Sequence, residues 1–179
     1  MSTAVAPLKE QKENINYSIA DSSLGRLLVA ATERGICALS LGDSDQALEN
    51  ELRKDYPKAH IHRDSARLEG WVVSIVDHLK DPSLPLQLPL DIQGTTFQWQ
   101  VWRQLQSIPP GETRSYAEIS QRLGRSGTAR AVGRACASNR VAIVIPCHRA
   151  VREDGQLGGY RWGLERKAVL LAREKASIR

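Results

Sequence analysis

The feature that most constrains the fold is a proline-bearing stretch near the middle of the chain, Asp81–Thr95. It contains three prolines, at positions 82, 85 and 89. Proline removes a backbone hydrogen-bond donor and clashes with the preceding helical turn, so this stretch is expected to be extended. We place a domain boundary here. Residues 1–90 are predicted to form an α/β domain, and residues 91–179 a mainly helical domain.

The first domain is expected to be a small antiparallel meander with two helices. Short aliphatic segments separated by turn residues predict three strands, Tyr17–Ala20, Arg26–Thr32 and Ile36–Leu41. Ser44 can cap a helix that runs to about Tyr56, where Pro57 stops it. A second helix is predicted over Ser65–Lys80, because apolar residues recur there at helical spacing.

The second domain is expected to contain a helix-turn-helix. A first helix is predicted over Phe97–Leu105 from its apolar spacing. Ser115 and Glu118 form a capping box that opens the next helix, and Gly124 ends it. Thr128 is expected to cap a further helix over Ala129–Ser138. Two helices joined by a short glycine-bearing turn, the second rich in arginine, are typical of DNA-binding proteins.

Charge is distributed unevenly between the two halves. Residues 1–100 carry ten Lys and Arg against fourteen Asp and Glu, a net charge of −4, whereas residues 101–179 carry fifteen against six, a net charge of +9. The segment Ile119–Arg152 contains seven arginines and no acidic residue. This pattern could be a solvated basic face, but it favours a polyanionic partner such as nucleic acid.

Composition excludes several classes of protein. No apolar run approaches the roughly eighteen residues that would span a bilayer, and the polar segment Met1–Asn16 lacks the apolar core of a signal peptide. Three cysteines without a C-x-x-C pair fit a reducing cytosol rather than a disulfide framework. The histidines are too scattered to form a zinc site with these cysteines, so no metal is expected; they are His60, His62, His78 and His148.

One cysteine stands out chemically. A buried strand is predicted over Val141–Ile145, and Pro146 would end it and hold Cys147 at a rigid strand exit. His148 and arginines nearby are surroundings that favour a thiolate, the nucleophilic form of cysteine. Cys37 and Cys136 are interpreted as core residues.

These residues carry a resemblance to a known family. The sequence Pro146-Cys147-His148-Arg149, preceded by an apolar segment and by Asn139, resembles the acceptor site of O6-alkylguanine-DNA alkyltransferases. The resemblance extends collinearly over about Phe97–Glu174 and is most similar to the C-terminal module of bacterial adaptive-response proteins. It implies a ribonuclease H-like N-terminal domain and a winged-helix-like C-terminal domain.

The resemblance implies a single-turnover cysteine S-methyltransferase that repairs DNA without a cofactor or a metal. Cys147 would accept the alkyl group from O6-methylguanine, and O4-methylthymine is a further expected substrate. His148 would act as a base through a water molecule, oriented by Glu174. Tyr116 would donate a proton toward the leaving purine, and Asn139 would be a hinge residue.

The resemblance also implies how DNA is bound. Arg130 would enter the duplex and fill the gap left by the flipped nucleotide, and the helix would lie in the minor groove, which carries little sequence information. Thr128, Ala129, Arg134 and Tyr116 would contribute to DNA binding. We expect the protein to act as a monomer in the cytoplasm.

The alkyl pocket is expected to be formed by Tyr160, Arg161, Trp162 and Ala150, again by resemblance. Family members that accept bulky groups carry small residues where this chain has Arg161 and Trp162. A large rigid side chain in a packed site excludes bulky groups, so methylguanine is expected to react much better than benzylguanine. The alternative is that Trp162 folds into the core.

Two other functions would each explain part of the sequence pattern. A DNA-binding regulator or lesion sensor without chemistry would explain the helix-turn-helix, but relatives of that kind lack the cysteine of the Pro-Cys-His-Arg motif. A thiol hydrolase would explain Cys147 and His148, but it would need an oxyanion hole and would have no use for a basic groove.

Overall fold

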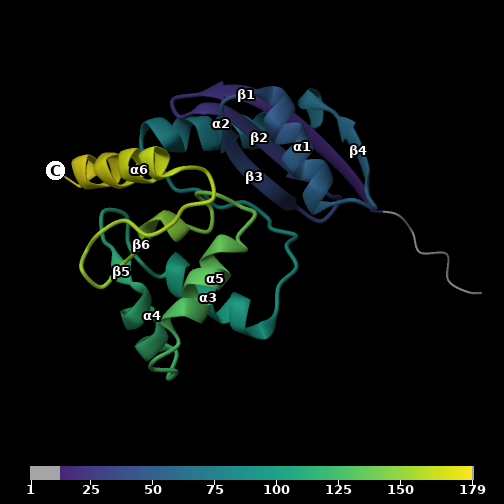
Figure 1. Cartoon of the computed structure of the whole chain (residues 1–179). Helices are drawn as coiled ribbons and strands as arrows, with labels where there is room; N and C mark the ends of the chain where they lie inside the picture. Colours follow the sequence, from purple (N-terminus) through teal and green to yellow (C-terminus); the bar gives the residue numbers. More distant parts are fainter. Residues whose placement is uncertain (1–12, 179) are drawn as a thin grey trace, which may run out of the picture.

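The computed structural model describes residues 13–178 (Figure 1). Most of the polar segment Met1–Asn16 lies outside these residues. The chain forms an N-terminal sheet domain and a C-terminal helical domain, and the stretch that connects them, Asp81–Thr95, contains no helix. Its residues are extended or in turns, as the prolines predict. No helix within residues 13–178 is long and apolar enough to cross a membrane.

The N-terminal domain contains a four-stranded sheet in the order β3-β2-β1-β4. The predicted antiparallel meander is confirmed as β1 (Asn14–Ser22), β2 (Gly25–Ala31) and β3 (Ile36–Gly42). The fourth strand, β4 (His60–Arg63), pairs with β1 in parallel and was not predicted. Its four residues include two histidines and an arginine, which give little strand signal on their own.

Two helices cover the two faces of this sheet. Helix α1 (Asp45–Asp55) is capped by Ser44, whose side chain accepts a hydrogen bond from the Ala47 amide. Helix α2 (Ser65–Lys80) has the predicted bounds. Side chains on β2 alternate between the faces, so that Leu28 shares a core cluster with α1 whereas Leu27 shares one with α2.

The C-terminal domain is built from short elements around the helix-turn-helix. Helices α3 (Thr96–Gln106) and α4 (Tyr116–Arg122) both begin with a capping box, in α4 the predicted pair Ser115 and Glu118. Thr128 is the N-cap residue of α5 (Ala129–Ala137), but its side chain does not cap the helix; its hydroxyl donates to the Arg125 carbonyl. In chain order the elements are α3 (Thr96–Gln106), β5 (Arg114–Ser115), α4 (Tyr116–Arg122), α5 (Ala129–Ala137), the 3₁₀ helix η1 (Cys147–Arg149), β6 (Ala150–Val151) and α6 (Leu164–Ser177).

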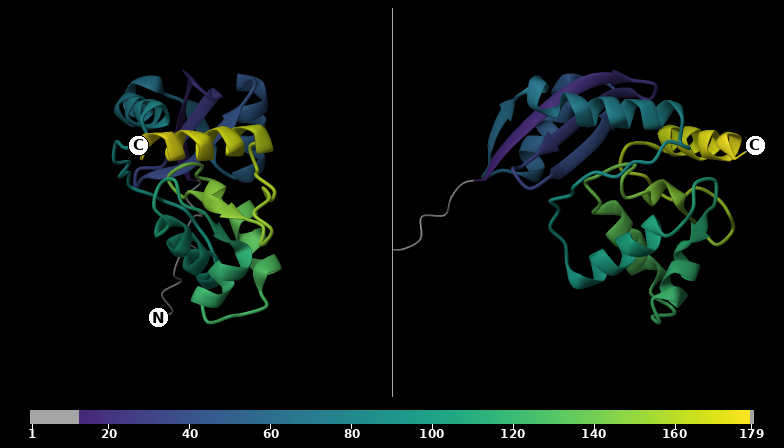
Figure 2. Two further views of the ribbon diagram at one scale, coloured as in Figure 1. Left: turned by 90° about the vertical axis from the view of Figure 1, so that its left-hand side faces the viewer. Right: turned by 180° about the vertical axis from the view of Figure 1, so that it is seen from behind.

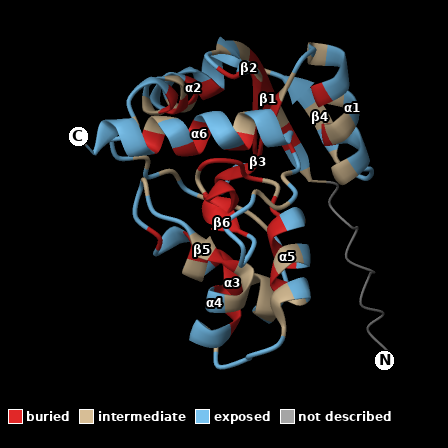
Figure 3. Ribbon diagram, turned by 60° about the vertical axis from the view of Figure 1, so that its left-hand side comes forward, coloured by how far each residue is buried: buried red, intermediate tan, exposed pale blue. Residues whose placement is uncertain are grey.

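The last helix, α6, runs beside both domains, and a single buried cluster extends from the α2 face of the sheet into the helical domain (Figures 2 and 3). Two arginines fix α6 to the turn between β1 and β2. The Arg166 side chain donates to the Leu24 carbonyl, and Arg173 donates to the Ser23 hydroxyl. The N-terminal domain therefore sets the position of α6.

The predicted strand over Val141–Ile145 is wrong. Only Val141 makes an isolated bridge, to Leu39 of β3, and the following residues form a turn in which Ile143 has a φ of 71°. The Asn139 side chain closes this turn, because it accepts from the Val141 amide and donates to the Ile145 carbonyl. The apolar run is buried by packing in the shared core rather than by strand pairing. We refer to residues 139–147 as the acceptor turn.

Candidate active site

A cavity of about 530 Å³ lies beside the acceptor turn. It brings together residues from four separated segments of the C-terminal domain. Its lining residues are Tyr116, Arg130, Gly133, Arg134, Cys136, Ala137, Cys147, Gly159, Tyr160 and Arg161. Six of the thirteen site residues predicted from the sequence line this one cavity.

Cys147 is the first residue of η1 and its side chain is almost completely buried. The Asn139 amide, which is fully buried, donates hydrogen bonds to the Cys147 Sγ atom at 3.3 Å and to the Ile145 carbonyl at 2.9 Å. One side chain therefore both shapes the acceptor turn and contacts its sulfur.

The expectation that the surroundings favour a resting thiolate at Cys147 is wrong. Burial raises the pKa of the thiol to about 11, and the hydrogen bond from Asn139 and the positive charge of Lys167 offset this only in part. Arg149, its neighbour in sequence, points instead to Glu174 and the Ile108 carbonyl. The thiol is protonated at neutral pH and needs a base to become a nucleophile.

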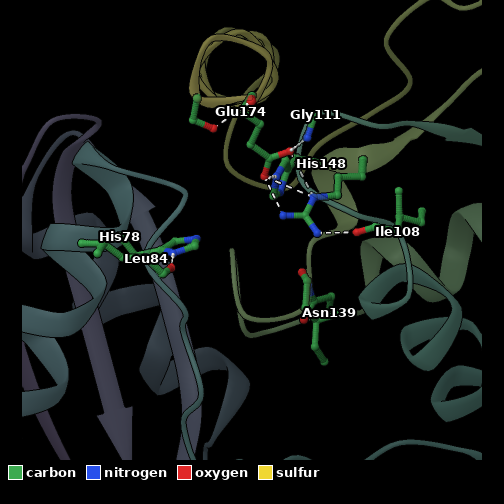
Figure 4. Close-up of polar contacts among 10 residues, drawn as sticks. His78, Leu84, Ile108, Gly111, Asn139, His148 and Glu174 are labelled. Carbon is green, nitrogen blue, oxygen red and sulfur yellow. Dashed lines mark hydrogen bonds and ion pairs between the residues drawn. The ribbon is translucent and has the colours of Figure 1, made fainter. Parts of the chain in front are cut away.

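His148, the residue after Cys147, belongs to a buried polar cluster around Glu174 (Figure 4). His148 Nε2 lies 2.7 Å from Glu174 Oε1, and Arg149 donates to both oxygens of the same carboxylate, with its Nη2 at 2.8 Å from Oε1. The Gly111 amide donates to Glu174 Oε2 at 3.2 Å. Glu174, which sequence alone would place in solvent near a helix end, is 3% exposed.

Gly111 is required for this arrangement. Its φ is +80°, a region that side-chain-bearing residues rarely adopt, and an added Cβ would collide with the side chain of Ile178, the residue that follows α6. The close approach brings the Gly111 amide against the carboxylate of Glu174.

Electrostatics fix the protonation states within the cluster. Burial by itself would raise the pKa of Glu174, but hydrogen bonds from His148 and Arg149 outweigh it and hold that pKa at about 2. Burial lowers the pKa of His148 below its usual 6.5, although Glu174 opposes this. With Glu174 ionised, the proton of the neutral imidazole lies on Nε2. The buried Nδ1 has no hydrogen-bond partner among residues 13–178, and it is the nitrogen that can accept a proton.

Helix α5 presents its arginines to the cavity and to solvent. Arg130 and Arg134 are exposed and line the cavity mouth one turn apart, whereas Val132 is buried in the core and Cys136 is a buried residue of the cavity lining. Thr128 and Ala129 lie at the start of the same helix, outside the cavity lining.

The four predicted pocket residues separate into two groups. Tyr160 and Arg161 line the cavity, but Trp162 and Ala150 do not. Trp162 is 4% exposed within the shared core and packs edge-on against the Tyr160 ring, with centroids 5.2 Å apart. Its apolar surface is buried there, so the expectation that it narrows the pocket is wrong. Ala150 is fully buried, and its carbonyl accepts from the Lys167 ammonium.

Two features of the site were not predicted. Lys167 is fully buried, and its Nζ donates to the Ala150 carbonyl at 2.6 Å and lies 5.9 Å from the centre of the Tyr116 ring. Gly158 packs so closely on the Tyr116 hydroxyl that a Cβ would collide with it. Burial raises the pKa of Tyr116 to about 12. Neither contact can be found by spacing, because the partners lie far apart in the chain.

Comparison with known proteins identifies the family. Residues 96–176 match the 6-O-methylguanine DNA methyltransferase DNA binding domain, and residues 15–92 match the ribonuclease-like domain of the same family. The chain belongs to the 6-O-methylguanine DNA methyltransferase family, as the sequence resemblance indicates.

Individual relatives are similar over most of the chain. The Escherichia coli bifunctional transcriptional activator/DNA repair enzyme Ada is 50% identical over 160 residues, 89% of this chain and 45% of Ada. The chain thus spans about half the length of Ada. The methylated-DNA–protein-cysteine methyltransferase of Mycolicibacterium paratuberculosis is 38% identical over 90% of this chain and 93% of its own length. The crystal structure of Mycobacterium tuberculosis OGT in complex with DNA has a TM-score of 0.75 at 34% identity, covering 92% of this chain and 94% of that one.

Proposed function

We propose that this protein repairs DNA directly by irreversible transfer of the methyl group of O6-methylguanine to Cys147. O4-methylthymine is proposed as a further substrate. The observation that carries the proposal is the cavity that Cys147, Tyr116 and Arg130 line together. His148, the residue after Cys147, is paired with the buried carboxylate of Glu174. The DNA-bound relative and the names of the relatives support the same activity.

The chemistry follows from the protonation states. The Cys147 proton passes to His148 Nδ1, through a water molecule, while Glu174 stabilises the resulting imidazolium. The thiolate attacks the methyl carbon in line, so that an S–C bond forms as the O6–C bond breaks. The Tyr116 hydroxyl donates a proton toward the departing guanine and is reprotonated from solvent. The product is a thioether, which has no easy hydrolytic exit, so each molecule reacts once.

DNA is proposed to bind along α5 through the minor groove. Arg130 and Arg134 are exposed at the cavity mouth, where Arg130 can occupy the space of the flipped nucleotide. Thr128 and Ala129 at the helix start would contact the backbone, and Asn139 would hold the acceptor turn in register. We propose that a cytoplasmic monomer performs this reaction without a cofactor or metal.

The test is an intact-mass measurement. The protein is incubated with a duplex that contains a single O6-methylguanine, and its mass is expected to rise by that of one CH₂ unit, mapped to Cys147. Cys147→Ala should abolish transfer but keep DNA binding. Cys136→Ala is the matched control, because Cys136 lines the same cavity and should not accept the group.

Transfer to Cys136, or continued transfer in Cys147→Ala, would overturn the assignment of the acceptor. Binding of the lesion without any gain in mass would instead favour a lesion sensor. Repeated turnover of substrate by one protein molecule would point to a hydrolase.

A further inference from the structure

One wall of the cavity is held by the N-terminal domain. Arg161 lines the cavity, yet its guanidinium contacts two carboxylates of α1, with Nε 2.6 Å from Glu51 Oε1 and Nη2 2.5 Å from Asp55 Oδ2. Glu51 and Asp55 are one turn apart, so both reach the same guanidinium.

The same end of α1 also contacts the acceptor turn. The guanidinium carbon of Arg140, the residue after Asn139, lies 5.1 Å from the centre of the Tyr56 ring. Its Nε lies 3.7 Å from Oδ2 of Asp55, the same carboxylate that binds Arg161. The end of one helix in the sheet domain thus contacts both the acceptor turn and the cavity-lining residue Arg161.

These carboxylates occupy an unfavourable place in their helix. Asp55 is the last residue of α1, where the helix dipole disfavours negative charge, and Glu51 lies one turn before it. They are compensated by arginines from the other domain. The side chains are mostly shielded from water, with Arg161 22%, Glu51 29% and Asp55 19% exposed, so screening by solvent is limited.

Residues 158–161, the chain segment that ends at Arg161 and forms this wall of the cavity, are also contacted by α6. Lys167 Nζ lies 3.4 Å from the Gly158 carbonyl and 3.5 Å from the Gly159 carbonyl. Gly158 also packs on the Tyr116 hydroxyl, and Tyr160 packs against Trp162. Beside this packing, residues 158–161 have two charged anchors, Lys167 within the C-terminal domain and the Glu51–Asp55 pair of the N-terminal domain.

We propose that Glu51 and Asp55 are positioning residues that hold residues 158–161 against the cavity and thereby favour small alkyl groups over bulky ones. The proposal rests on the proposed function. Without its ion pairs to Glu51 and Asp55, Arg161 would no longer hold residues 158–161 in place. The methyl group would then be positioned less accurately relative to Cys147, whereas a benzyl group would have more room in the cavity.

The experiment compares the parent with Glu51→Gln/Asp55→Asn. Transfer rates to Cys147 are measured from two duplexes that differ only in carrying O6-methylguanine or O6-benzylguanine, so that DNA contacts cancel in the ratio. Methyl transfer should slow by about fivefold or more, because small misplacements of a reacting group cost up to about 100-fold, and the benzyl-to-methyl rate ratio should rise. The matched control is Glu69→Gln/Asp77→Asn, which removes the same charge from α2, away from Arg161.

A second readout does not depend on activity. Hydrogen exchange of residues 158–163 should accelerate in Glu51→Gln/Asp55→Asn but not in the control, while exchange in β2 stays unchanged in both. Adding Arg161→Gln to the double variant should not accelerate this exchange further, since the carboxylates act on residues 158–163 through Arg161.

Unchanged exchange in residues 158–163, or an unchanged rate ratio, would overturn the positioning role. A parent that transfers no methyl group to Cys147 would instead refute the proposed function, and the exchange measurement would still decide whether the carboxylates hold the wall.

Discussion

The arginines of the C-terminal domain form two groups with different surroundings. The seam arginines contact the N-terminal domain; they are Arg140, Arg161, Arg166 and Arg173. The groove arginines are exposed and form no ion pair with any residue in the range 13–178; they are Arg122, Arg125, Arg130 and Arg134. Arginine side chains thus join the two domains in the first group and are available to a polyanion in the second.

A count of charges in the sequence overstates the number of arginines that are available to a polyanion. Seven arginines lie in the acid-free segment Ile119–Arg152, but three of them have carboxylate partners from outside it. Arg140 is near Asp55, Arg149 binds Glu174, and Arg152 Nη2 lies 3.6 Å from an oxygen of Asp154. The other four arginines have no carboxylate partner among residues 13–178 and are available to the proposed DNA partner; these are the groove arginines on and around the helix-turn-helix.

The largest expected effect comes from breaking the buried cluster beside the seam. Glu174→Ala would leave Arg149 and His148 buried without their carboxylate, and loss of one partner of a buried pair costs about 3–5 kcal/mol. Urea unfolding should show this loss. Glu174→Gln, which keeps the shape and one acceptor oxygen, should lose less. Equal stability of Glu174→Ala and the parent would contradict the burial of this cluster.

The same cluster predicts acid sensitivity. The pKa of Glu174 is depressed to about 2 from 4.5, so its stabilisation is complete above pH 4.5 and is lost as the pH falls toward 2. At about 1.4 kcal/mol per pKa unit, the contribution is on the order of 3 kcal/mol. The depressed pKa of His148 adds a further loss of stability that begins as the pH falls through 6.5.

Unfolding free energies measured from pH 7 to pH 3 should therefore decline, and the decline below pH 4.5 should be reduced in Glu174→Gln. A decline of the same size in that variant would assign the acid sensitivity to other carboxylates.

Sequence predicted the parts of the molecule that local rules govern. The meander, both flanking helices and the helix-turn-helix follow from turn residues, capping boxes and apolar spacing. β4 was missed because a short polar strand is defined by its partner β1. The strand predicted over Val141–Ile145 was wrong because the buried Asn139 side chain closes the segment into a turn. The apolar residues of this segment are explained by burial in the core and not by pairing with a neighbouring strand.

The sequence predicted which residues form the candidate site better than it predicted their protonation states. Cys147, Tyr116 and Arg130 were identified from a motif and meet at one cavity. The protonated state of the thiol was not predictable, because burial depends on the whole core. The burial of Trp162 and the contact of Arg161 with α1 also depend on tertiary packing, since Arg161 lies 110 residues from Glu51 in the chain.

A groove arginine should affect reaction with duplex DNA rather than folding. Arg130→Ala is expected to slow repair of a methylated duplex by about tenfold to a hundredfold, because unstacking a nucleotide costs a few kcal/mol that an inserted side chain offsets. Reaction with free O6-methylguanine needs no extrusion and should change little. Equal slowing with both substrates would mean that Arg130 belongs to the pocket or the fold.

The smallest effect gives the sharpest test of the comparison, because it sets one arginine of each group against the other. Arg134→Ala should lower the slope of log affinity for duplex DNA against log salt by about one, the loss of one phosphate contact, and leave unfolding within about 0.5 kcal/mol of the parent. Arg173→Ala removes the same charge, but Arg173 donates to Ser23 and to the Leu79 carbonyl, so it should lower stability by about 1 kcal/mol and keep the slope. Salt titrations of binding and urea unfolding of both variants measure the two quantities. If Arg173→Ala changes the slope as much as Arg134→Ala does, the basic charge acts as a diffuse field and the distinction between seam and groove arginines does not hold.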